Sequence, residues 1–242
     1  TETRYDEKVT TYGYDAKGNR RGVTDFEGVG TTYEYDAQDR LKVVRVAEGE
    51  TRYGYFEDGL EKTKDVFNGM HEGRCYDAAG RLTALVTAHV GGTDACNVTT
   101  YVSRHRYGYD AEGNRLRQDE ELTQPSGVLV SEGTEYGYDE EARLVGVRYP
   151  TEAVLYRLDA VGNRTGERKL ASGLVTALTA AAFLAVSPAA LTSDVTAVFN
   201  RADWLKTVTD GKAPAKDARF EWDAAGNLKR QVTAGRDRRF DW

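Results

Sequence analysis

A short pattern recurs along the 242-residue chain: two aromatic residues at alternate positions, then Asp-Ala-x-Gly-Asn and a basic or aliphatic residue. Tyr12–Arg20 is one copy and Tyr107–Leu116 is another. From Asp15 to Asp36 is 21 residues, and this period returns with longer intervals at three joints. Such a repeat predicts stacked supersecondary units. When the copies are aligned, the position of the turn aspartate is occupied by Asp15, Asp36, Phe56, Asp77, Asp110, Asp139, Asp159, Asn200 and Asp223.

Each copy predicts a β-hairpin with its turn included. Aromatics at positions i and i+2 share one face of a strand, and Asp followed three residues later by Gly is typical of a type I turn closed by a bulge. The glycine is expected at positive φ, which Asp39 and Asp203 tolerate in its place, whereas Ala142 predicts a different turn. The residues predicted to form these structural repeat turns are Asp15, Gly18, Asp36, Asp77, Gly80, Asp110, Gly113, Asp139, Asp159, Gly162, Asp223 and Gly226.

The fold class that follows is all-β, with consecutive antiparallel hairpins forming a curved or spiralling ribbon. We expect residues 1–242 to form a single array, because a unit of this length cannot bury a face alone. The insertions fall at about 86–100, 118–132 and 171–193. Residues 239–242 repeat the pattern of residues 219–222, so we expect further repeats beyond this segment.

The third insertion is the most apolar part of the chain, with no charged residue between Leu170 and Ser193. It favours a short inserted helix with Leu174, Leu178 and Ala182 on one face, although an apolar strand pair is the alternative. Leaving this surface in water costs about 25 cal/mol per Å² of apolar area. We therefore expect its own sheet to cover it, and the alternative is a neighbouring chain.

Composition and missing motifs limit the function. The net charge of -6 argues against a nucleic-acid partner, and no transmembrane segment is expected. No residues match a catalytic, cofactor-binding or metal-binding pattern, so we expect neither an enzyme nor a cofactor. Cys75 and Cys96 are the two cysteines, and both a disulfide and two free thiols are compatible with the sequence.

The repeated Tyr-x-Tyr-Asp-Ala-x-Gly-Asn-Arg-Leu resembles the YD-repeat, or RHS, family over residues 12–242 apart from the insertions. That family includes RHS polymorphic toxins, cocoon components of insecticidal toxin complexes, wall-associated proteins and teneurins. The resemblance implies a β-ribbon that coils into a hollow shell around a C-terminal toxin. The family's Asp-Pro self-cleavage motif has no counterpart here, because the chain holds no Asp-Pro dipeptide.

The leading functional prediction is therefore a non-enzymatic shell segment of a secreted or cell-surface protein that encapsulates a toxin for bacterial competition. Its expected partners are the remaining repeats and the enclosed polypeptide. The alternative is a cell-surface adhesion or glycan-binding array. Tyrosines 33, 35, 107 and 109 distinguish the two, because buried side chains favour the shell and an exposed stripe favours adhesion.

Overall fold

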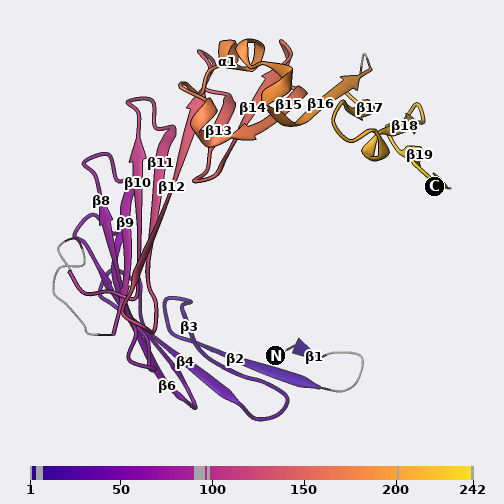
Figure 1. Ribbon diagram of the computed structural model, residues 1–242. Helices are drawn as coiled ribbons and strands as arrows, with labels where there is room; N and C mark the ends of the chain where they lie inside the picture. The colour runs from indigo at the N-terminus through magenta and orange to yellow at the C-terminus, as the bar shows by residue number, and fades with distance from the viewer. Residues whose placement is uncertain (1, 4–7, 90–95, 97–98, 201, 241–242) are drawn as a thin grey trace. The chain divides into compact units, whose positions relative to one another are not determined.

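The computed structural model describes residues 2–3, 8–89, 96, 99–200 and 202–240. The chain divides into two compact units, Thr1–Tyr107 with Asp119–Ser131, and Gly108–Gln118 with Glu132–Trp242. Both are built from antiparallel strands, and the one α-helix of the described residues is α1 (Ala180–Ala185) (Figure 1). The all-β class of consecutive hairpins with a short inserted helix is confirmed.

In the first unit each strand pairs with the next strand in sequence, from β1 to β10. Strands β10, β11 (Arg115–Thr123) and β12 (Leu129–Tyr138) contribute residues to both units. The strands up to β10 are β1 (Glu2–Thr3), β2 (Val9–Tyr14), β3 (Arg20–Thr24), β4 (Gly30–Tyr35), β5 (Leu41–Val46), β6 (Gly49–Tyr55), β7 (Glu61–Asp65), β8 (His71–Tyr76), β9 (Leu82–Ala88) and β10 (Ser103–Tyr109).

The second unit continues the same pairing from β12 to β20. Short 3-10 turns lie at Ser172–Leu174, Pro188–Ala190 and Pro214–Lys216. The remaining strands are β13 (Leu144–Arg148), β14 (Glu152–Leu158), β15 (Arg164–Ala171), β16 (Leu191–Phe199), β17 (Leu205–Asp210), β18 (Ala218–Trp222), β19 (Leu228–Thr233) and β20 (Arg236–Arg239).

The repeat pattern separates the two faces of each sheet. Tyr136 pairs with Val147, while the next residue, Gly137, pairs with Gly146 and points the other way. We call the side that bears the first aromatic of each repeat the aromatic face and the opposite side the glycine face. In the repeat hairpins the strand after the turn carries an extra residue, which shifts the register just before the second aromatic, as between Gly54 and Tyr55.

Candidate functional site

The turn aspartates bind the backbone of their own turns. In the turn that begins at Asp77, the side-chain Oδ1 accepts the N–H groups of Ala79 and Arg81 at 2.9 and 3.0 Å, and Oδ2 accepts Arg81 Nε at 2.7 Å. Gly80 N–H donates to the Asp77 carbonyl at 3.0 Å, which closes the turn. Oδ1 accepts the N–H of the residue four positions later in the same way at Asp15, Asp36, Asp110, Asp139, Asp159 and Asp223.

Two kinds of side chain complete this arrangement. An arginine four residues after the aspartate binds Oδ2 of Asp36, Asp77 and Asp139, whereas an asparagine does so at the other aspartates of the set. The Arg81 backbone N–H and guanidinium lower the pKa of Asp77 below its ordinary value of 3.8. The Asn227 side-chain amide and backbone N–H lower the pKa of Asp223 likewise.

The residue that closes each turn lies in the left-handed region. Gly18, Gly113, Gly162 and Gly226 have φ between 89° and 97°, as expected from the turn sequence. Ala142 has φ 60°, and its N–H donates to the Asp139 carbonyl at 3.0 Å. The expectation of a different turn at Ala142 is therefore wrong. The bonds to Asp139 hold the alanine in a conformation that alanine rarely adopts.

The second aromatic of a repeat also binds the preceding repeat, a contact that sequence reasoning missed. Tyr55 Oη donates to the Leu41 carbonyl at 2.6 Å, and Leu41 lies five residues after the turn aspartate Asp36. The same offset recurs in Tyr35 to Arg20, Tyr76 to Glu61, Tyr138 to Arg115 and Trp222 Nε1 to Leu205, at 2.7 to 3.0 Å. We call these bonds the lateral clamps.

Turn arginines add a second link between successive repeats. Arg40 Nη1 donates to the Phe56 carbonyl at 3.1 Å, and its guanidinium lies 4.6 Å from the centre of the Tyr55 ring. Arg143 Nη1 makes the equivalent bond to the Asp159 carbonyl at 3.1 Å. Each arginine thus joins its own turn to the first residue of the next repeat turn.

The apolar insertion, residues 172–190, lies on the glycine face of the second unit, where α1 packs beside β14 (Figure 1). Three strand glycines make room for it, and we call them the glycine cradle. A Cβ atom on Gly137 would stand 1.9 Å from the Leu178 carbonyl oxygen, and one on Gly146 would stand 3.1 Å from Leu178 Cβ. A Cβ atom on Gly166 would stand 2.6 Å from Phe183 Cζ.

Two arginines of the sheet bind the backbone of the insertion. Arg148 Nη2 donates to the Val175 carbonyl at 2.6 Å, and Arg168 Nη1 donates to the Phe183 carbonyl. Arg168 also lies 4.5 Å from the centre of the Phe183 ring and is paired with Asp194 at 3.1 Å. These contacts hold a short segment that has few backbone hydrogen bonds of its own.

The insertion is only partly covered. Phe183 is 3% exposed and packs in a core with Ala153, Leu155, Leu170, Val175 and Leu191, whereas Leu184 is 73% exposed. Leu178 is half-buried. Its own sheet therefore covers one side of the insertion, as expected. The expected helix was too long, because α1 begins at Ala180 and leaves Leu174 and Leu178 outside it.

Of the two alternatives for the cysteines, the structure has the disulfide. Cys75 of β8 is bonded to Cys96, with Cα atoms 5.7 Å apart. On the same face, Tyr101 packs against Val86 and Ala88, and its hydroxyl donates to Glu121 Oε2 at 2.6 Å. The other residues between 90 and 98 lie outside the described part of the chain.

The four tyrosines expected to distinguish a shell segment from an adhesion array are all half-buried: Tyr33, Tyr35, Tyr107 and Tyr109. Tyr35 also makes a lateral clamp. They form no exposed stripe. Among the described residues, no group of three or more His, Cys, Asp or Glu side chains could hold a metal ion. No helix in that part of the chain has the length and apolar character needed to cross a membrane.

Comparisons with solved structures place the fold. A chain in the Photorhabdus luminescens Tc holotoxin pore superposes with a TM-score of 0.57 at 16% identity, covering 95% of this chain and 13% of that one. A chain of TcdB2-TccC3 without its hypervariable C-terminal region gives 0.62 at 16% identity, covering 97% and 12%. A further TcdB2-TccC3 structure gives 0.57, also at 16% identity, covering 95% and 14%. No family model and no curated protein matches the chain.

The fold and the turn pattern together define the class, which is an array of consecutive antiparallel hairpins like that of these toxin-complex chains. This likeness supports the YD-repeat type of fold that the sequence pattern resembles. The present chain spans 12% to 14% of the length of those matched chains.

Proposed function

We propose that this chain is a segment of the β-sheet wall of a secreted YD-repeat protein that encloses a toxin polypeptide until delivery. The observation that supports this most is the likeness of 95% to 97% of the chain to chains of Tc toxin complexes. The partners of the segment are then the other repeats of the same wall and the enclosed polypeptide. The segment itself is not an enzyme in this proposal.

The mechanism is steric. Within each unit, ladder hydrogen bonds join every strand to the next, and lateral clamps such as Tyr55 to Leu41 tie successive repeats together. A sheet of this kind leaves no gap between its strands through which a protease or a folded domain could pass, because the strands are about 4.8 Å apart. Enclosure requires only that the wall stays continuous.

The Cys75–Cys96 disulfide supports a site of action outside the reducing cytosol, since disulfides form and persist in oxidising compartments. A secreted or cell-surface location is the one that this chemistry favours. It is also the location where an enclosed toxin would need protection from proteases.

The test is protease protection of the enclosed polypeptide in the full-length protein that contains this segment. We would replace the clamp tyrosines Tyr35, Tyr55 and Tyr76 together by phenylalanine, which removes three hydroxyl bonds and keeps the rings. Tyr14→Phe is the matched control, because Tyr14 is 62% exposed.

The proposal predicts that the enclosed polypeptide resists limited proteolysis in the wild type and in Tyr14→Phe, and is cleaved sooner in the triple variant. Cleavage of that polypeptide at the rate of the same polypeptide expressed alone, in the wild type, would contradict it.

A further inference from the structure

A groove of about 250 Å³ lies on the aromatic face of the second unit. Its floor is formed by apolar side chains of two paired strands, β16 and β17, all half-buried: Val195, Ala197, Phe199, Leu205 and Val208. Ala197 pairs with Val208, and Phe199 pairs with Leu205, so these side chains project to the same side. The floor can therefore receive apolar side chains from another molecule.

The β15 side of this groove is basic. Glu167 is the acidic residue of the lining, and it is paired with Arg164 at 3.3 Å and with Lys169 at 3.7 Å. One carboxylate thus lies between two cations. The excess charge on this side is positive.

Two more arginines extend the basic character across the same face. Val208 pairs with Ala218, Ala218 with Thr233 and Thr233 with Arg236, so Arg236 projects to the groove side. Arg238, two residues on, projects there too. Both arginines are exposed, and among the described residues no acidic side chain pairs with either one.

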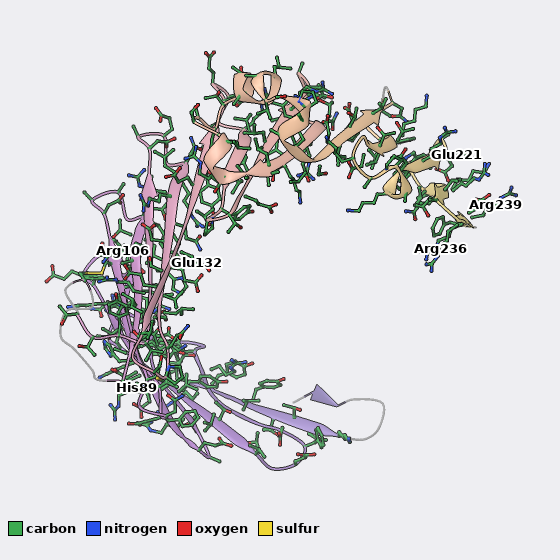
Figure 2. The ribbon with its side chains drawn as sticks, viewed as in Figure 1. His89, Arg106, Glu132, Glu221, Arg236 and Arg239 are labelled. Atoms are coloured by element: carbon green, nitrogen blue, oxygen red, sulfur yellow. A yellow bond between two sulfur atoms is a disulfide. The ribbon has the colours of Figure 1, made fainter. Side chains whose placement is uncertain are left out.

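The acidic residues of β18 and β20, Glu221 and Asp237, are used on the opposite face, and Asp210 on the groove face is buried and accepts the Ser193 hydroxyl. Arg230 binds Asp237 at 2.8 Å and Glu221 at 3.1 Å, and it pairs across the sheet with Arg239. Figure 2 shows Arg236 and Arg239 projecting in different directions from β20. Among the described residues of β19 and β20, the one acidic side chain, Asp237, is therefore on the face opposite to Arg236 and Arg238.

We propose that the groove and the Arg236–Arg238 strand bind an acidic polypeptide segment that also carries apolar side chains. This rests on the proposed function, because it names the chemistry of the enclosed segment. The chain as a whole has a net charge of -6, whereas this face carries an excess of positive charge that attracts an acidic segment. Three strand spacings separate Val208 from Arg236, or roughly 14 Å, which an extended peptide spans in about four residues.

The test is fluorescence anisotropy of labelled peptides mixed with the 242-residue chain. The first peptide has three leucines, a two-residue spacer and three glutamates. A second peptide replaces the glutamates by lysines, and a third replaces the leucines by serines. We expect the first to bind at least about tenfold more tightly than either control, and its binding to weaken with salt.

Charge-reversed variants locate the binding. The double variant Arg236→Glu and Arg238→Glu should lose at least about tenfold in affinity for the first peptide. The matched control, Arg219→Glu with Arg239→Glu, makes the same change in net charge on the opposite face and should keep wild-type affinity.

Equal binding of the three peptides, no binding of the first, or equal losses in both double variants would overturn the proposal. These outcomes are separate from protease protection in the full-length protein. A wall whose groove binds no acidic segment could still enclose its polypeptide and protect it from the protease.

Discussion

The carbonyl oxygen of Leu178 occupies the space in which a side chain of residue 137 would begin, because a Cβ atom on Gly137 would lie only 1.9 Å from it. The equivalent position in the first repeat is Gly13, which also stands between two tyrosines. There the nearest atom to an added Cβ would be 3.9 Å away, an ordinary contact. The insertion thus imposes a packing requirement at Gly137 that is absent at Gly13.

Replacing Gly137 by alanine should therefore destabilise the protein by about 1–3 kcal/mol, since the added methyl group must displace the insertion backbone. Gly13→Ala is the matched control and should be neutral or slightly stabilising, because alanine loses less conformational entropy than glycine on folding. Urea unfolding of both variants measures the difference. Equal effects would show that Leu178 does not lie on Gly137 in solution.

Two adjacent residues of α1 should differ sharply on truncation. Phe183 is 3% exposed and contacts Gly166 and Arg168, so Phe183→Ala should lower the free energy of unfolding by about 3 kcal/mol or more. Leu184 is 73% exposed, so Leu184→Ala should change it by less than about 0.5 kcal/mol. Thermal unfolding, together with hydrogen exchange of the insertion, distinguishes the two variants. Similar losses of unfolding free energy in both would mean that the insertion does not pack on its sheet.

The turn at Asp139 should be improved by glycine. Ala142→Gly removes the strain of a side chain at φ 60° and should stabilise the protein by about 1 kcal/mol. The reverse change, Gly162→Val at φ 93°, should destabilise it by about 1–2 kcal/mol or more. Denaturant unfolding measures both variants. Destabilisation by Ala142→Gly would mean that the turn is not left-handed at this residue.

Acid should weaken the turns. The folded-state pKa of Asp77 is lowered, so its contribution to stability is fully present above the ordinary value of 3.8 and is lost as the pH falls through the lower folded value. Asp77→Asn should retain the backbone bonds at about pH 6 and reduce the loss of stability at about pH 3. The native Asn200 accepts the same two backbone N–H bonds without a charge. An unchanged pH dependence in the variant would rule out this linkage.

The sequence predicted the hairpins and their turns because those depend on local chemistry. Asp77 and Gly80 sit in a turn that a few neighbouring residues define, and its period repeats along the chain. The turn at Ala142 was predicted wrongly, because the hydrogen bonds that Asp139 accepts impose a φ that is unfavourable for alanine. The turn aspartate determined the conformation more strongly than the residue that closes the turn.

The non-local contacts were harder to predict. The clamp from Tyr55 to Leu41 joins separate repeats, and only the constant spacing of the repeats could have suggested it. The glycine cradle has a weak sequence signal, because Gly137 and Gly146 leave one face of two neighbouring strands without a side chain at these positions. Nothing in their local sequence says that Leu178, far along the chain, fills that space. The disulfide likewise depends on how residue 96 returns to β8.

The most direct test of the proposed wall is a cryo-electron microscopy structure of the full-length protein that contains this segment. The account predicts that residues 12–240 form part of a wall around a closed volume, with density for a second polypeptide inside it. A map in which this segment borders no enclosed volume, or in which the downstream polypeptide lies wholly outside the wall, would contradict the account.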